Sequence, residues 1–96
     1  MKLDLEMKIF KALGHPVRLG IIKKLVEGEK CVCKLVDSSE FSQANLSQHL
    51  KVLSNAGLIN KRKDGNFSLY SISDEKVKEL IKLCEEITSN YIKKLI

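Results

Sequence analysis

The spacing of apolar residues changes twice along this chain, and the two changes define its fold class. As far as Asn55 the apolar residues recur at the three-to-four-residue spacing of amphipathic helices. The helical spacing then stops, polar and apolar residues alternate across 66–71, and Asp64-Gly65 before this stretch is a strong signal for a two-residue hairpin turn. Helical spacing returns after Ser73. The pattern predicts a mainly α domain with one β-hairpin before its last helix.

Residues that suit helix ends divide the helical part into separate helices. Gly14 and Pro16 separate the first two helices, because glycine favours a helix C-terminus and proline a first turn. Gly28 ends the second helix, and the Ser42 hydroxyl can cap the fourth. The predicted helices cover residues 1–13, 16–26, 32–37, 42–55 and 73–96, with a turn at 38–41 and strands at 58–63 and 66–71.

The size and composition favour a single soluble domain, residues 1–96. Apolar residues make up 44% of the chain and charged residues 30%, which is typical of a soluble globular protein. We expect a cytoplasmic protein with no membrane partner, since no apolar run is long enough for a span and the first residues lack a secretory pattern. The net charge of +5 favours an anionic partner, although ordinary solubility charge explains it equally well.

The last predicted helix carries a longer apolar stripe than a domain of this size can cover by itself. We therefore expect a homodimer formed through the terminal helices. The stripe consists of Val77, Leu80, Ile81, Cys84, Ile87, Thr88, Tyr91, Ile92 and Leu95.

The fourth predicted helix has one narrow apolar face and one face of hydrogen-bonding side chains. Leu46, Leu50 and Leu53 form the apolar face, and the order of elements around this helix is that of a winged helix-turn-helix. Asparagine and glutamine can pair with adenine, serine with any base, and basic hairpin residues with phosphates. The expected contacts with double-stranded operator DNA are Gln43, Asn45, Ser47, Gln48, His49, Lys51, Lys61, Arg62 and Lys63. For His49 a hydrogen bond within the core is a nearly equal alternative.

Four segments carry motifs in a specific joint order: residues 12–19 (ALGHPVRL), 31–35 (CVCKL), 42–53 (SQANLSQHLKVL) and 55–59 (NAGLI), the last followed by a charged hairpin. Together these segments resemble the ArsR/SmtB family of metal- and metalloid-responsive repressors. The resemblance covers nearly the whole chain. It implies a dimeric winged-helix transcriptional repressor that occupies its operator and leaves it when an effector binds.

Cys31 and Cys33 are the main chemical feature of the chain. Three cysteines in a cytosolic-looking protein suggest metal binding or redox chemistry more than structural disulfides. The pair lies at the start of the third predicted helix, where the helix dipole and the flanking Lys30 and Lys34 favour thiolates. Two small buried structural residues are the alternative.

The Cys-Val-Cys stretch resembles the thiolate effector motif of arsenic- and cadmium-sensing relatives. Soft ligands of this kind select As(III), Sb(III), Cd or Pb. Val36 stands where arsenic sensors often carry a third cysteine, so Cys84, a solvent thiol or the other subunit must complete the site. At its place on the apolar stripe Cys84 is more often a core residue than a ligand. The zinc-sensing ligand set of the family looks lost, because Lys76 follows Asp74 where a histidine is needed.

Two further interpretations remain open from the sequence. The same repressor could respond to oxidation or to a persulfide at the cysteine pair. The second interpretation is a winged-helix module that binds proteins instead of DNA. An enzyme is not expected, because the two histidines have no matched carboxylate and the chain has no phosphate-cradling glycine loop and no paired acids. The effector, the third ligand and the operator sequence stay undetermined.

Overall fold

The computed structural model describes the backbone of residues 1–37 and 43–96, and the side chains of 1–35 and 45–96. All five predicted helices are present within these ranges, whereas the predicted turn at 38–41 and the Ser42 cap lie outside them. None of the described helices is long and apolar enough to cross a membrane. The elements are α1 (Lys2–Leu13), α2 (Pro16–Val26), β1 (Lys30–Cys31), α3 (Val32–Asp37), α4 (Gln43–Asn55), β2 (Ile59–Asp64), β3 (Phe67–Ile72) and α5 (Glu75–Leu95).

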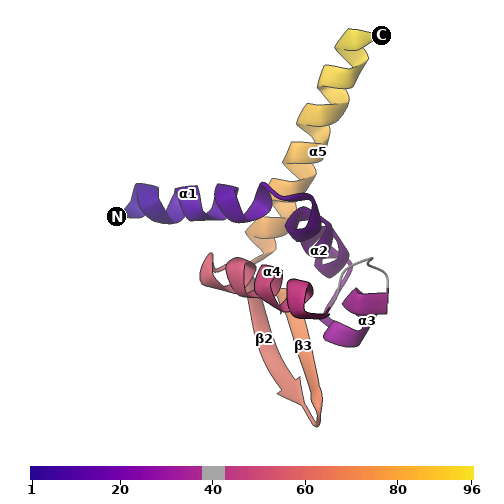
Figure 1. Cartoon of the computed structure of the whole chain (residues 1–96). Coiled ribbons are helices and arrows are strands. Elements are labelled where there is room, and N and C mark those ends of the chain that lie inside the picture. Colours follow the sequence, from indigo (N-terminus) through magenta and orange to yellow (C-terminus); the bar gives the residue numbers. More distant parts are fainter. Residues whose placement is uncertain (38–42) are drawn as a thin grey trace.

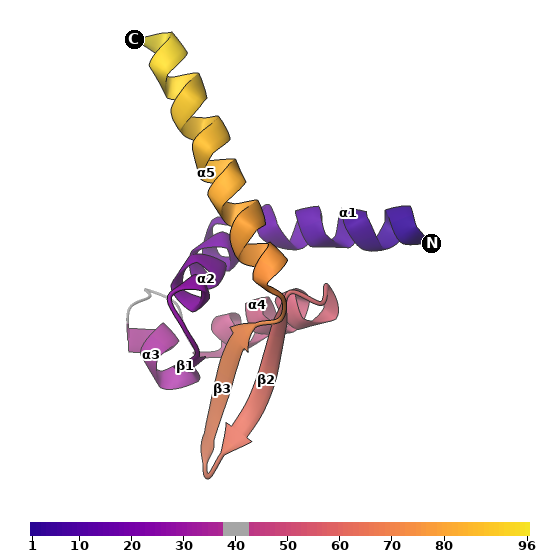
Figure 2. The ribbon, with the colours of Figure 1, turned by 180° about the vertical axis from the view of Figure 1, so that it is seen from behind.

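Helices α2, α3 and α4 and the base of the hairpin form the body of the molecule (Figure 1). Helix α1 projects from this body to one side, α5 projects from it in another direction, and the hairpin of β2 and β3 extends away from α5. The view from behind shows the same arrangement and the short strand β1 beside β3 (Figure 2). The two terminal helices are thus largely unsupported by the rest of the chain.

The core consists mainly of branched aliphatic side chains from the body. The predicted inward residues of α4, Leu46, Leu50 and Leu53, are at most 2% exposed, which confirms the apolar face of this helix. Close packing of this kind fixes the orientation of α4 and leaves its opposite face in solvent. The other most deeply buried large side chains are Ile22, Leu25, Leu35 and Leu58.

The end of α4 is fixed by backbone hydrogen bonds that lead the chain into the hairpin. The Leu58 N–H donates to the Leu53 carbonyl over 3.1 Å, and the Gly57 N–H donates to the Ser54 carbonyl over 3.0 Å. Together with the φ of 78° at Gly57 these bonds form a Schellman motif, which needs a residue in the left-handed region. The motif brings Leu58 back into the core at the start of the hairpin.

The sheet has three strands in the order β1-β3-β2, all antiparallel. Strand β1 was not predicted, because two residues are too few to show alternation. The predicted turn at Asp64-Gly65 is wrong by one residue. Asp64 pairs with Phe67, so Gly65 and Asn66 form the turn, with the one positive φ of 63° at Gly65.

The face of β3 that packs on the core carries Tyr70, which is 8% exposed, whereas Phe67 is 60% exposed. Period-two alternation in the sequence separates these two faces but does not say which one is buried.

The apolar faces of α1 and α5 are only partly covered. Val77 and Ile81 at the start of α5 are buried, but the stripe beyond them is exposed, with Ile87 at 69% and Leu95 at 67%. Phe10 on α1 is also 65% exposed. Uncovered apolar surface of this extent on two projecting helices is typical of an interaction surface.

Candidate DNA-binding face and cysteine pair

The solvent face of α4 carries most of the predicted base-reading residues. Asn45, Ser47, Gln48 and Lys51 are all exposed, while the leucines of the same helix anchor it to the core. Gln43 is the first residue of α4, but its side chain lies outside the described residues. The face therefore offers amide, hydroxyl and ammonium groups along a rigid helix, as a DNA-reading helix requires.

His49 occupies a different environment from its polar neighbours. It is partly buried, its ring centroid lies 4.6 Å from that of His15, and its Nδ1 lies 3.4 Å from an Arg18 guanidinium nitrogen. Burial, followed by the charges of His15 and Arg18, lowers the pKa of His49 from its ordinary value of 6.5. This geometry favours the hydrogen-bonding alternative that the sequence left open for His49.

Arg18 joins three helices and was not singled out in the sequence. Its Nε donates to the Ala12 carbonyl over 2.7 Å, and another guanidinium nitrogen donates to the Lys11 carbonyl, both at the C-terminal end of α1. His15 accepts the Val17 N–H at Nδ1 and so caps α2. No sequence signal separates Arg18 from the other surface cations of the chain.

The hairpin carries the three predicted wing cations on β2, and all three are exposed. The Lys61 ammonium lies 5.9 Å from the centroid of the Tyr70 ring, its cross-strand partner. Both nitrogens at one edge of the Arg62 guanidinium donate to the Glu29 carboxylate, each over 2.7 Å. Arg62 is therefore paired within the chain, which the sequence did not indicate.

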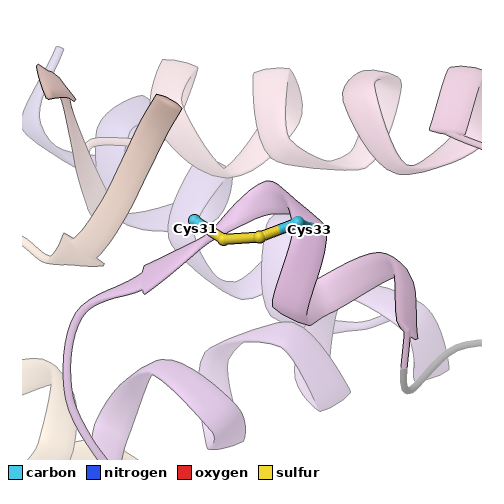
Figure 3. Close-up of a disulfide and its surroundings, with 2 residues drawn as sticks. All are labelled: Cys31 and Cys33. Atoms are coloured by element: carbon cyan, nitrogen blue, oxygen red, sulfur yellow. A yellow bond between two sulfur atoms is a disulfide. The ribbon is translucent and has the colours of Figure 1, made fainter. Parts of the chain in front are cut away.

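The sulfur atoms of Cys31 and Cys33 are joined in a disulfide between the end of β1 and the first turn of α3 (Figure 3). Cys31 thus belongs to a strand, and only Cys33 belongs to the helix. In the sheet register Cys31 lies opposite Leu69, and Leu69 lies opposite Arg62. The cysteine pair is therefore located at the edge of the sheet that forms the wing.

Cys84 does not join this pair. It is a free, exposed cysteine on α5, where the apolar stripe is not covered by the rest of the chain. The expectation that it is a core residue is wrong for the single chain. Within residues 1–37 and 43–96 no three histidine, cysteine or acidic side chains come close enough to hold a metal ion.

Known proteins share both the sequence and the fold. The family described as bacterial regulatory proteins of the arsR family matches residues 15–61, from the α2 cap to the start of β2. An uncharacterised helix-turn-helix transcriptional regulator from Methanocaldococcus jannaschii is 45% identical over 90% of this chain and 98% of its own length. The arsenical resistance operon repressor of Bacillus subtilis is 43% identical over 88% of this chain and 80% of its own. The chain belongs to the ArsR family.

Among solved structures, a homodimeric winged helix-turn-helix DNA-binding domain from Mycobacterium bovis superposes with a TM-score of 0.89. The match covers 96% of this chain and 85% of the other at 27% identity. These similarities confirm the predicted winged helix-turn-helix fold. ArsR relatives are transcriptional regulators and not enzymes, as expected from the sequence.

Proposed function

We propose that this ArsR-family protein is a homodimeric repressor that inserts α4 into the major groove of operator DNA. The exposed polar face of α4 beside a basic hairpin is the observation that carries this proposal. Asn45, Ser47 and Gln48 read base edges, and Lys51, Lys61 and Lys63 contact phosphates. Gln43, at the N-terminus of α4, joins the base-reading set on the strength of the sequence.

Pairing of two chains through α1 and α5 covers their exposed apolar faces. Such a dimer presents two recognition helices about 34–36 Å apart, which is one turn of DNA. The homodimeric domain from M. bovis supports the pairing of two chains.

The cysteine pair is the effector site in this proposal, and a soft metalloid such as As(III) is the first candidate. Cys31 and Cys33 are close enough for their sulfurs to bond, so after reduction both thiolates can hold one ion. Each thiol that binds arsenite forms one S–As bond and releases one water. The third ligand comes from outside the pair, such as a small-molecule thiol. The arsenical resistance repressor among the relatives supports this candidate, and Sb(III), Cd and Pb suit the same ligands.

Oxidation of the pair is the second candidate, and the disulfide favours it directly. In that case the switch is the conversion of two thiols into a disulfide by an oxidant, or their reaction with a persulfide. No metal is needed. Both candidates act at the same two sulfurs and reach the wing through the same strand.

Fluorescence anisotropy of a labelled duplex from the region upstream of the gene tests the function and separates the candidates. Arsenite is added to reduced protein in the presence of a monothiol reductant, and diamide is added separately without metalloid. Release by arsenite, reversed by a competing dithiol, supports the metalloid sensor. Release by diamide alone, reversed by reductant, supports the redox switch.

Cys31→Ser combined with Cys33→Ser is expected to bind the duplex as tightly as the reduced wild type and to respond to neither reagent. Cys84→Ser is the matched control and should respond normally. A normal response of the double variant contradicts the site assignment. Absence of any affinity for the upstream duplex supports the protein-interaction module instead.

A further inference from the structure

Arg62 differs from the other wing cations because a carboxylate already binds it. Its Nε and one terminal nitrogen donate to the two oxygens of Glu29, both over 2.7 Å, which is the bidentate geometry in which arginine binds anions most strongly. The bond to Arg62 lowers the pKa of the Glu29 carboxyl, so the pair stays ionised at neutral pH. The same edge of a guanidinium is the one that arginine presents to a phosphate.

The register of the sheet explains how Glu29 reaches this arginine. Cys31, Leu69 and Arg62 are successive cross-strand partners, so their side chains share one face of the sheet. Glu29 lies two residues before Cys31 and directly precedes β1, and its carboxylate reaches Arg62 on β2. The ion pair thus connects the segment that leads into the cysteine pair with the outer strand of the wing.

A carboxylate and a phosphate compete for the same guanidinium edge. While Glu29 holds Arg62, the wing presents its two lysines to DNA with less help from the arginine, although Arg62 remains 57% exposed. We propose that Glu29 acts on the DNA interface through Arg62, by competing with a DNA phosphate for the guanidinium. This role rests on the proposed DNA-binding function.

Glu29→Gln tests the role through the salt dependence of DNA binding. The amide keeps the shape of the side chain but no longer competes as an anion, so Arg62 becomes available to the DNA. Each additional phosphate contact steepens the slope of log K against log salt by about 0.9, which is about 3.5-fold more affinity lost between 50 and 200 mM salt. We expect Glu29→Gln to show this steepening once for each wing that contacts the upstream duplex. Glu29→Gln combined with Arg62→Gln should show none, because the arginine is absent.

Glu27→Gln is the matched control. It raises the net charge by the same amount, but Glu27 pairs with Lys30 and not with a wing residue. Arg62→Lys provides a second test at unchanged net charge, because lysine cannot form the bidentate bond and its ammonium is then available to phosphate. Its slope should also exceed that of the wild type.

The outcomes separate this role from the function on which it rests. If the wild type binds neither the upstream duplex nor a random duplex, the proposed function fails and the role of Glu29 fails with it. If the wild type binds but the slope of Glu29→Gln equals that of Glu27→Gln, DNA binding stands and the role of Glu29 is wrong. A shallower slope in Glu29→Gln also overturns the role, since it means that the ion pair holds Arg62 toward the DNA.

Discussion

Replacement of Ile87 by alanine is expected to dissociate the proposed dimer without unfolding the protomer. Ile87 lies on α5 beyond the last buried residue, Ile81, and is 69% exposed in the single chain. The substitution removes every side-chain carbon beyond Cβ, which is worth ~2.4 kcal/mol for a fully buried isoleucine at about 0.8 kcal/mol per carbon group. Only the surface exposed in the protomer becomes newly buried on pairing, which reduces this value to ~1.7 kcal/mol.

A two-fold symmetric interface contains each substitution twice, so the dimer loses ~3.3 kcal/mol and its dissociation constant rises about 200-fold. Sedimentation equilibrium over a range of concentrations measures this constant. Glu86→Ala, on the opposite and polar face of α5, is the control and should leave it unchanged, because alanine also suits the helix. A dissociation constant for Ile87→Ala equal to that of the wild type refutes the interface, as does a wild type that stays monomeric at tens of micromolar.

Three further predictions concern stability. Gly57→Ala should lower the free energy of unfolding by about 1–2 kcal/mol, because φ is 78° although the added Cβ meets nothing within 4 Å. Gly20→Ala inside α2, where an added Cβ also meets nothing within 4 Å, should raise the free energy of unfolding by about 0.5–1 kcal/mol. Equal effects of the two substitutions in chemical denaturation would contradict the backbone argument. Since the pKa of folded His49 lies below 6.5, the unfolded chain takes up a proton first as pH falls, and stability drops below pH 6.5. Between pH 7.5 and 5.5 the melting temperature of His49→Gln should fall less than that of the wild type. An identical fall would exclude His49 as the source of the pH dependence.

The sequence predicts those parts of the fold that depend on local periodicity. Leu46, Leu50 and Leu53 recur at helical spacing and are all buried, so the orientation of α4 follows from the pattern alone. The hairpin was predicted with its turn one residue early, since Asp64-Gly65 and Gly65-Asn66 both contain a suitable glycine. Cross-strand register decides between them, and register depends on the face that packs against the core.

Features that depend on other parts of the molecule were not predictable in the same way. The exposure of Cys84 follows from the projection of α5 beyond the body, because a stripe that continues past the core is available to a second chain. The sequence pattern is the same whether a stripe is covered by its own chain or by another. For the same reason the pattern indicated a dimer while it placed Cys84 in the core.

The wing contains charged residues that the sequence identifies, but their ion pairs depend on the fold. In the sequence Lys61, Arg62 and Lys63 are three equivalent cations beside a turn, and nothing nearby distinguishes the arginine. Arg62 becomes distinct only when β1 joins the sheet, because that pairing brings Glu29 within 2.7 Å across a separation of 33 residues. Glu29 directly precedes β1, whose second residue is Cys31. If the proposed effector acts at the cysteine pair, a change in bonding there has a short route to Arg62, because Cys31 lies two residues after Glu29, which binds this arginine.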